Sequence, residues 1–302
     1  NAMVIFGSKP RSYKELPLRL SDTDRLHRYE LSGTLSGLLR VRSFQQDDSH
    51  NFITEKQIKE EYEQIIGLCD KFYGIFGMKY SFRLGTRPKK FMGDVKLWDK
   101  AEKELKDILK KSGKKFTVLE GDGAFYGPKV DILMTDSMGR EWQMGTIQLD
   151  MQMPLRFGLK YTDENNKEQT PIVIHRVIYG SLERFIGILL EHTNGRLPTW
   201  LAPIQVRVLS FTDRNIDYAR QMIKKIGEAI PELRLDADLR STTVQSKVKE
   251  AEIMRVPYII VAGDKEEKDK TIAVRVRGNP KIVTYKVDEF ANKLKEEIRD
   301  RK

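Results

Sequence analysis

The pattern of apolar residues changes near Leu201, and this change limits the chain to a two-part architecture. Before it, extended runs such as 129–136 (KVDILMTD) and 141–151 (EWQMGTIQLDM) follow one another directly, which favours a largely antiparallel sheet. After it, extended runs alternate with amphipathic stretches, as in a compact α/β module with a mixed sheet. The segment NGRLPTWLAP, with its glycine and prolines, marks the boundary. We therefore predict an α/β (α+β) chain with two domains, 1–200 and 201–302.

Helical spacing and cysteine content describe the first part further. Apolar residues recur at i, i+3, i+4 and i+7 in 55–77, and helices are also predicted over 97–112 and 182–193. Residues 5–50 instead give short extended pieces. Cys69 lies on the apolar side of the first helix, so we predict that it is a core residue. Because it is the one cysteine of the chain, no internal disulfide can form, which is typical of a reducing compartment.

Composition limits the class of protein and its partners. A chain of 302 residues with 39% apolar residues is predicted to be soluble and globular. Its longest apolar runs fall far below the ~18 residues that a membrane span needs, and no signal-peptide pattern is present. The net charge of +10 favours a polyanionic partner, although basic proteins without such a partner are equally common. The opening Asn-Ala-Met either is a cleaved-tag scar or continues a native strand.

Between His27 and His50 the sequence predicts a hairpin with a polar, functional face. Strand side chains alternate between faces, so the even-numbered positions share one surface. They are Arg28, Glu30, Arg40, Arg42, Phe44, Gln46, Asp48 and His50. The order of arginines, aromatic ring, amide, carboxylate and imidazole favours a bound anionic substrate over a solvated strand. From Arg40 to His50 the face would extend over about 30 Å, enough for a nucleotide beside a second small ligand.

Other polar residues interrupt apolar or glycine-rich segments. The amides within an apolar strand are those of Gln143 and Gln148. A buried strand would have to satisfy both amides, so they favour a cleft. Lys129 follows the run EGDGAFYGP, which is either an anion-binding loop or an ordinary turn. Near the start of a helix, Arg184 either extends to solvent or contacts a nucleotide. His50 and His175 are either structural residues or metal ligands, and a zinc site would need a third protein ligand.

Segments along nearly the whole chain together resemble one family. They are SYKELPLR, HRYELSG, GLLRVRSFQQDDSH, EGDGAFYGPK, GTIQLD and IHRVIYGSLERFIGILLEH, with DLR, VPY, GDKE and AVRVR nearer the C-terminus. This set resembles the threonyl-tRNA synthetase family of class II aminoacyl-tRNA synthetases. The resemblance implies a class II catalytic domain over 1–200, an antiparallel sheet with flanking helices that carries motifs 2 and 3. It implies a smaller α/β anticodon-binding domain over 201–302.

The resemblance also implies roles for the polar residues of the first domain. ATP would be bound by Arg28, Glu30, Arg40, Phe44, Gln143 and Arg184, and threonine by Gln46, Asp48, Tyr126, Lys129 and Gln148. Catalysis would rest on Arg28, Lys129 and Arg184, and zinc on His50 and His175. Arg28 would contact the α-phosphate and Arg40 the γ-phosphate, with Glu30 near the adenine. The adenine would lie between Phe44 and Arg184. Such a reaction proceeds by positioning and charge stabilisation and needs no protein acid or base.

The activity implied by the resemblance is that of a threonine–tRNA ligase. It would form threonyl-adenylate from threonine and ATP, release pyrophosphate, and transfer the threonyl group to tRNA(Thr). Mg²⁺ would accompany ATP. Zn²⁺, bound by the amino group and hydroxyl of threonine, would reject valine but admit some serine, which lacks only a methyl group. A cytoplasmic location and a homodimer in the full-length enzyme are implied as well.

Three features of the family lie outside this sequence. The third zinc ligand (a cysteine), the dimer-forming motif 1 and the N-terminal editing domains would all precede Asn1, and Cys69 lies in the wrong helix to replace that ligand. A separate protein acting in trans would then be one way to clear mischarged seryl-tRNA. The alternative function is a catalytically incomplete tRNA-binding or regulatory synthetase fragment.

In the second domain, the resemblance implies that Glu266 and Arg275 read anticodon bases. Ser241 stands where bacterial members often have asparagine, which weakens the expectation of one base contact. Three further cations are either phosphate contacts or ordinary surface charge. They are Arg240, Lys247 and Arg277.

Overall fold

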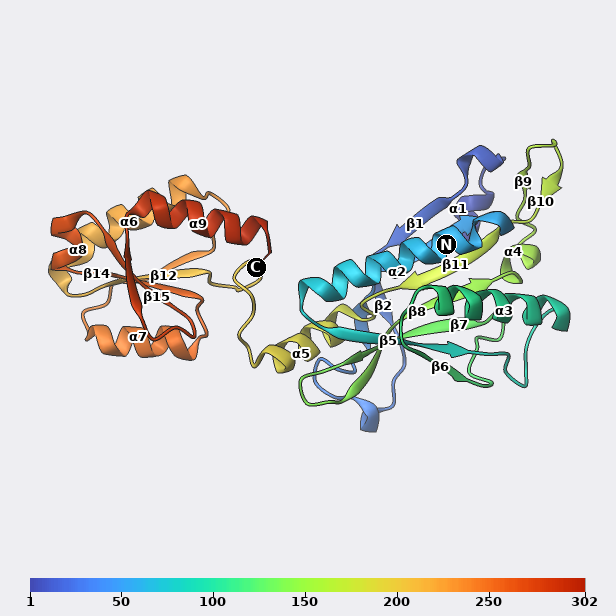
Figure 1. The fold of residues 1–302 in the computed structure, drawn as a ribbon, viewed down its shortest axis with the longest axis horizontal. Helices are drawn as coiled ribbons and strands as arrows, with labels where there is room; N and C mark the ends of the chain where they lie inside the picture. The colour runs from blue at the N-terminus through green and yellow to red at the C-terminus, as the bar shows by residue number, and fades with distance from the viewer. Residues whose placement is uncertain (302) are drawn as a thin grey trace. The chain divides into compact units, whose positions relative to one another are not determined.

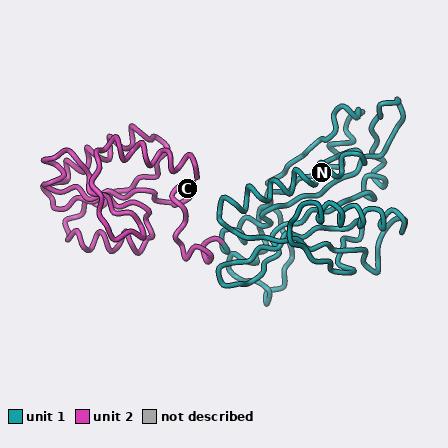
Figure 2. The backbone as a smooth tube through the Cα atoms, in the orientation of Figure 1, with its two compact units in different colours: residues 1–188 teal, residues 189–302 magenta. Residues whose placement is uncertain are grey.

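The computed structural model of the protein describes residues 1–301, which form two compact units. Figure 2 colours the first unit, residues 1–188, teal and the second unit, which starts at Leu189, magenta. Each unit contains its own principal sheet, and the two are described separately. The domain boundary expected between residues 200 and 201 stays a prediction.

The first unit is built on a seven-stranded sheet whose neighbouring strands are all antiparallel except β5 and β6 (Figure 1). In spatial order the strands are β1 (Leu18–Asp22), β4 (Asp48–Ile53), β11 (Ile172–Val177), β8 (Glu141–Asp150), β7 (Lys129–Thr135), β5 (Lys79–Gly85) and β6 (Phe116–Leu119). The largely antiparallel sheet expected from the extended runs is confirmed. Strand β5 is missing from those runs, because its sequence KYSFRLG holds few aliphatic residues.

Two helices, α2 (Ile58–Ile75) and α3 (Val95–Lys111), pack against each other and cover one face of this sheet (Figure 1). In both helices the apolar residues repeat every three or four positions and are buried. The side chain of Asp94 caps the N-terminus of α3. Cys69 of α2 is fully buried, as predicted, and burial raises the pKa of its thiol to about 12.

The remaining elements of the first unit are short. They are the helices α1 (Ala2–Gly7) and α4 (Met153–Arg156), the paired strands β2 (Arg25–His27) and β3 (Ser43–Gln45), the paired strands β9 (Tyr161–Thr162) and β10 (Glu168–Gln169), and 3₁₀ turns at Tyr13–Glu15, Ser32–Thr34 and Glu55–Gln57. Helix α5 (Leu182–Thr193) begins in this unit and ends in the second. Helix α1 corrects the expectation of an extended N-terminus. Its Phe6 stacks on Phe52 of β4 with ring centroids 4.4 Å apart, so packing against the sheet holds this segment as a helix.

The segment 27–50 does not form the single hairpin that alternation predicts. Strand β2 pairs with β3 in a small ribbon, whereas β4 belongs to the seven-stranded sheet. The residues between β2 and β3 form a loop, because SGTLSG supplies glycines and serines that favour turns over continued pairing. The chain therefore leaves one sheet and enters another between Gln45 and Asp48, and the continuous polar strand face from Arg40 to His50 is not formed.

The second unit has a five-stranded mixed sheet, as predicted. Its strands in spatial order are β13 (Leu235–Asp238), β12 (Val206–Ser210), β14 (Tyr258–Ala262), β15 (Ile272–Val276) and β16 (Ile282–Tyr285). Strand β12 is parallel to both of its neighbours, and the other two pairs are antiparallel. The helices are α6 (Ile216–Ala229), α7 (Val244–Ile253), α8 (Asp264–Asp269) and α9 (Val287–Arg299), with a 3₁₀ turn at Asp213–Asn215.

Helices cover both faces of the second sheet. Helices α6 and α9 lie on one face, where Met222 and Phe290 pack with Val274 of β15, and α7 lies on the other face (Figure 1). Since side chains alternate along a strand, Arg275 of β15 points to the α7 side. Nowhere in residues 1–301 is there a helix long and apolar enough to cross a membrane.

Candidate nucleotide and amino-acid site

A row of polar residues crosses four strands of the first unit's sheet. From strand to strand it consists of His50 (β4), His175 (β11), Gln148 (β8) and Lys129 (β7). Residues directly opposite each other in a sheet share a face. On the other face of β4, Asn51 donates a hydrogen bond to Glu61 of α2 at 2.7 Å. The polar row therefore lies on the face of the sheet turned away from α2.

A fully buried carboxylate, Asp131, joins three side chains on this face. Its Oδ2 lies 2.8 Å from Nη2 of Arg83 and 3.4 Å from Nζ of Lys129. Its Oδ1 accepts a hydrogen bond from Nε2 of Gln143 at 3.0 Å, while Arg83 donates to Oε1 of the same amide at 2.9 Å. Both ends of the Gln143 amide are therefore occupied, which fixes its orientation.

A cavity of about 440 Å³ lies over this face, and we call it the sheet cavity. Its predicted lining residues are Arg28, Glu30, Arg40, Phe44, Gln46, Gln143, Gln148 and Arg184, and its further lining residues include Met144, Thr146 and Ser181. These come from the β2–β3 loop, from β3 and the residue after it, from β8, and from the start of α5 with its preceding turn. The loop thus brings together residues that the prediction assigned to one face of a hairpin. The volume lies in the range of small-molecule sites.

The arginines of the sheet cavity leave it positively charged. Arg40 pairs with Glu30, with Nη2 and Oε2 3.1 Å apart. The guanidinium of Arg28 lies 5.1 Å from the centroid of the Phe44 ring. In the part of the chain that the structure describes, neither Arg28 nor Arg184 has a carboxylate within 4.0 Å. Burial, and then the charge of Arg40, lowers the pKa of Arg184. Unneutralised guanidinium groups suit a polyphosphate ligand.

The backbone around the cavity fixes Arg184 at the start of α5. Its Nε donates to the carbonyl oxygen of Leu39 at 2.8 Å, which ties α5 to the β2–β3 loop. The preceding turn contains Gly180 at φ +78°, where a Cβ would lie 2.1 Å from the carbonyl oxygen of Met144. Only glycine fits this close approach to β8 without moving the backbone.

Asp47 is a partly buried anchor that the sequence analysis did not single out. It accepts hydrogen bonds from the backbone N–H groups of Ile178 at 2.9 Å and Tyr179 at 3.2 Å, and from Nη1 of Arg176 at 3.3 Å. Burial raises its pKa to about 6 despite these bonds. Alternation assigns only its neighbour Asp48 to the site face, and no sequence signal indicates that Asp47 binds a backbone segment more than a hundred residues away.

Residues predicted for threonine gather around the histidines. Tyr126 donates to Oε1 of Gln148, and its ring centroid lies 5.4 Å from that of His175. Burial, with Asp150 and Asp48 nearby, raises the pKa of Tyr126 to about 12, so its hydroxyl is a donor at neutral pH. Oδ2 of Asp48 lies 4.0 Å from Nδ1 of His50. The arrangement forms a small polar subsite next to the sheet cavity.

His50 and His175 are adjacent, with ring centroids 4.7 Å apart. Burial lowers the pKa of His50, which favours the neutral imidazole that binds metals. Nε2 of His175 lies 2.9 Å from Oδ2 of the buried Asp150. Across residues 1–301, no group of three or more His, Cys, Asp or Glu side chains could hold a metal ion. The two imidazoles fit part of a zinc ligand set, and one further protein ligand would complete it.

In the second unit the predicted RNA contacts lie on different elements. Glu266 belongs to α8 and Arg275 to β15, and Ser241 donates to Asp213 at 2.8 Å. Nε of Arg275 is buried, and it has no hydrogen-bond partner within residues 1–301. The roles of Glu266 and Arg275 in reading bases stay predictions.

The three candidate phosphate contacts of this unit differ in their surroundings. Lys247 is fully buried, and its Nζ donates to the carbonyl oxygen and Oγ of Ser210, both at 2.9 Å. It is neither a phosphate contact nor a surface charge, because it lies one turn before Ala251 on the buried side of α7. Arg240 pairs with Asp238 and Glu250, each at 2.6 Å. Arg277 lines a separate cavity of this unit.

Comparison with known families identifies both parts of the chain. Residues 2–193 match the tRNA synthetase class II core domain (G, H, P, S and T), and residues 205–297 match an anticodon binding domain. The chain is 45% identical over 300 residues to a threonine–tRNA ligase of Desulforamulus reducens, covering 99% of this chain and 47% of that protein. It is 47% identical over 295 residues to that of Symbiobacterium thermophilum, covering 98% and 45%. The chain thus spans about half the length of these curated relatives.

Solved structures give the same result. The crystal structure of the RNA binding domain of threonyl-tRNA synthetase from Cryptosporidium parvum superposes with a TM-score of 0.93 at 38% identity. The superposition covers 98% of this chain and 74% of the Cryptosporidium chain. A putative threonyl-tRNA synthetase from Aeropyrum pernix superposes with a TM-score of 0.83 at 28% identity, covering 99% and 73%.

Proposed function

Since the chain belongs to the threonyl-tRNA synthetase family of class II aminoacyl-tRNA synthetases, we propose that it acts as a threonine–tRNA ligase. It activates threonine with ATP to threonyl-adenylate and transfers the threonyl group to tRNA(Thr). One observation carries this proposal: a nucleotide-sized cavity with unneutralised arginines adjoins a small polar subsite on the same sheet face. The curated relatives, named as threonine–tRNA ligases, support the choice of amino acid and tRNA.

On the nucleotide side, the proposal assigns the phosphates of ATP to the arginines. Arg28 offsets the negative charge that develops at the α-phosphate when the threonine carboxylate attacks and pyrophosphate leaves. Arg40 binds the γ-phosphate, and Glu30, which pairs with it, lies near the adenine. Phe44 and Arg184 enclose the adenine. The fixed amide of Gln143 supports a role in holding the nucleotide, because a rigid contact costs little entropy on binding.

On the amino-acid side, carboxylate and amide groups hold the substrate next to the α-phosphate. Asp48 and Gln46 would bind the amino group of threonine, and Tyr126, Gln148 and Lys129 would complete the subsite. Lys129 carries a positive charge that attracts the threonine carboxylate toward the reacting phosphorus. With the two substrates so positioned, no side chain has to move a proton in the activation step.

Two metal ions belong to the proposal. Mg²⁺ accompanies ATP in class II synthetases. His50 and His175 would hold Zn²⁺, with a cysteine ahead of Asn1 as the third protein ligand that the family resemblance implies. When bound, Zn²⁺ would be ligated by the amino group and the hydroxyl of threonine. Valine lacks this hydroxyl and would offer the metal one ligand fewer.

The wider setting of the reaction is also proposed from the family. We propose that the full-length enzyme is a cytoplasmic homodimer, and that a separate protein acting in trans hydrolyses mischarged seryl-tRNA. The basic net charge of +10 supports binding of tRNA, whose phosphates release counterions on contact with Lys and Arg.

Threonine-dependent exchange of pyrophosphate into ATP, measured with added Zn²⁺ and Mg²⁺, tests the proposal. Arg28→Ala and His50→Ala should each lower the exchange rate by about 100-fold or more. Arg156→Ala is the matched control, since this arginine is exposed and lies outside the sheet cavity, and it should leave the rate unchanged. Absence of exchange by the unchanged chain, with tRNA binding intact, would instead support the alternative of a catalytically incomplete tRNA-binding fragment.

A further inference from the structure

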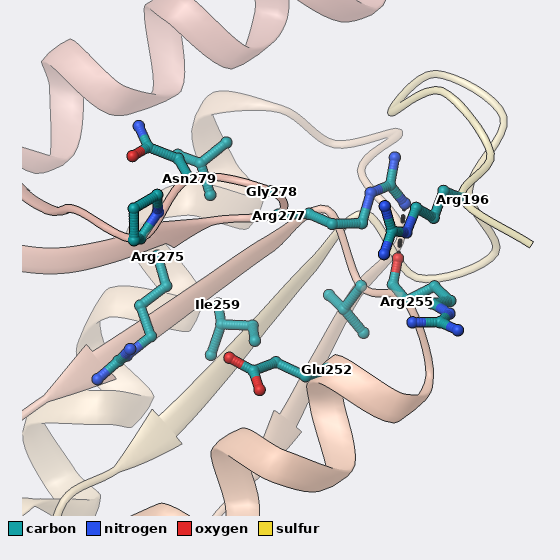
Figure 3. A pocket seen from close by; sticks show the side chains of 11 residues that line it. Arg196, Glu252, Arg255, Ile259, Arg275, Arg277, Gly278 and Asn279 are labelled. Atoms are coloured by element: carbon teal, nitrogen blue, oxygen red, sulfur yellow. Dashed lines mark hydrogen bonds between the residues drawn. The ribbon is translucent and has the colours of Figure 1, made fainter. Parts of the chain in front are cut away.

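The second unit contains a cavity of about 430 Å³, which we call the arginine cavity. Its charged lining residues are Arg196, Arg255, Arg275, Arg277 and Glu252. They come from the segment before β12, the end of α7, and β15 with its following turn. Figure 3 shows Arg196 and Arg277 reaching into the same end of the cavity, with Arg275 on the far side of Ile259.

Within residues 1–301, none of the four arginines forms a salt bridge with a carboxylate. Other arginines of the second unit do form such pairs, for example Arg207 with Asp236 and Arg240 with Asp238. Glu252 is the single carboxylate of the lining, so the cavity carries an excess of positive charge. Like charges gathered in a partly buried space repel one another, and an anion would relieve that repulsion.

The cavity is built rather than assembled from loose surface side chains. Nη1 of Arg277 donates to the carbonyl oxygen of Arg255 at 2.7 Å, and its Nη2 donates to that of Leu197 at 2.6 Å. These bonds hold the Arg277 guanidinium in place, and burial, followed by the charges of Arg196 and Arg255, lowers its pKa. Arg275 keeps a buried Nε that has no partner within residues 1–301. A guanidinium held in place beside two further arginines suits an anion.

We propose that the arginine cavity binds one nucleotide unit of an RNA through its backbone phosphate. Guanidinium groups match the geometry of a phosphate, and the exposed Pro280 offers an apolar surface for the ribose. The size of the cavity suits a nucleotide better than a lone ion. Arg275, which also lines the cavity, connects it to the predicted base contacts. The inference rests on the proposed function, which makes tRNA(Thr) the RNA.

Binding of a labelled tRNA(Thr) transcript to the whole chain, measured over a range of salt concentrations, tests this assignment. Arg196→Gln and Arg255→Gln each remove one charge and leave the backbone bonds of Arg277 in place. Each should weaken binding about 10-fold and reduce the steepness of the salt dependence by about one phosphate contact. The matched control is Lys225→Gln, which removes one exposed charge from α6 on the opposite face of the sheet and should bind like the unchanged chain.

The outcomes separate this inference from the proposed function. If both cavity variants bind tRNA like the unchanged chain while pyrophosphate exchange persists, the arginine cavity does not take RNA and the ligase proposal stands. Failure of the unchanged chain to bind tRNA would overturn both. Inorganic phosphate is the third probe. If it raises the unfolding temperature of the unchanged chain but not of the cavity variants, and their tRNA affinity is normal, the cavity holds a free anion and the RNA assignment is wrong.

Discussion

The sheet cavity and the arginine cavity have nearly equal volumes, about 440 and 430 Å³, and both expose arginines without carboxylate partners. They differ in everything else that lines them. The sheet cavity adds amides such as Gln143 and Gln148, hydroxyls, and an adjoining pair of imidazoles. The arginine cavity adds mainly aliphatic side chains and backbone. The lining of the sheet cavity can orient several different polar groups at once, whereas the charged lining of the arginine cavity favours a phosphate group above all.

The sheet cavity is built to position reacting groups, whereas the arginine cavity is built only to bind a ligand. In the sheet cavity, the bonds of Asp131 and Arg83 fix the orientation of Gln143 before any substrate arrives. Preorganised groups of this kind stabilise a transition state, because they need not reorganise as charge develops. The arginine cavity holds its fixed guanidinium through backbone carbonyls alone, which is sufficient for a phosphate that undergoes no reaction. We therefore expect changes in the two cavities to affect different measurements.

The largest effect expected is on the activation rate. Arg184→Ala should lower threonine-dependent pyrophosphate exchange by about 100- to 1,000-fold, since it removes a half-buried cation that the proposal puts against the adenine. Its affinity for tRNA(Thr), measured by the same binding titration, should change less than about twofold. Arg196→Gln should give the reverse pattern, with weaker tRNA binding and normal exchange. A loss of both activities in either variant would break the separation between the two cavities.

Much of the fold could be predicted from the sequence, because its signals are local. The extended runs around Gln143 and the helical repeat that buries Cys69 both depend on residues close together in the chain, and both are confirmed. The segment 27–50 was harder. Its alternation is compatible with a strand, but the turn-forming glycines and serines of SGTLSG decide the conformation of the part before Arg40.

The parts that escaped prediction depend on contacts between distant segments. From the sequence, Lys247 is indistinguishable from a surface cation. In the structure, packing of α7 on its sheet encloses the Lys247 side chain next to Ser210. Asp47 and Arg83 likewise gain their partners only after strands far apart in sequence pair. The arginine cavity collects Arg196 and Arg255 from separate segments, and neither has a neighbouring motif that marks it. Such sites follow from tertiary packing rather than from periodicity.

Backbone packing gives a second contrast between the units, with a smaller effect. A Cβ at Gly145 would lie 2.1 Å from the carbonyl oxygen of Val177, so Gly145→Ala must push β8 and β11 apart beneath the sheet cavity. We expect it to lower the free energy of unfolding by about 2–3 kcal/mol and to reduce exchange. In the second unit nothing lies within 4 Å of a Cβ at Gly227 in α6. Gly227→Ala should raise stability by about 0.5–1 kcal/mol and leave tRNA binding unchanged.

Chemical denaturation monitored by circular dichroism measures both glycine variants. Equal effects of Gly145→Ala and Gly227→Ala would contradict the close approach of β8 to the end of β11. A destabilised Gly145→Ala variant with normal exchange would mean that the sheet cavity tolerates a shift of its strands.

The stability of the two units should respond to pH in opposite ways, through the carboxyl groups of Asp47 and Asp238. Burial raises the pKa of Asp47 to about 6, above the value of about 3.9 expected in the unfolded chain, so the folded state binds this proton more tightly. The stability contributed by its protonation is fully present below pH ~4 and is lost as the pH rises through ~6. Asp238 in the second unit behaves in the reverse way. Its hydrogen bonds from Arg240 lower its pKa, so its contribution is present above pH ~4 and is lost as the pH falls further.

Asp47→Asn isolates the first of these responses, since the amide has nearly the same shape but does not titrate. The difference in unfolding free energy between Asp47→Asn and the unchanged chain should shift by on the order of 2 kcal/mol in favour of the variant between pH 4 and pH 7. Asp238→Asn, the comparison in the second unit, should show a much smaller change over this range, because the lowered pKa of Asp238 puts most of its titration below pH ~4. A flat difference for Asp47→Asn would mean that the bonds from Ile178, Tyr179 and Arg176 outweigh burial and keep Asp47 ionised. The anchor between β4 and β11 would then be a permanent charge rather than one that titrates near pH 6.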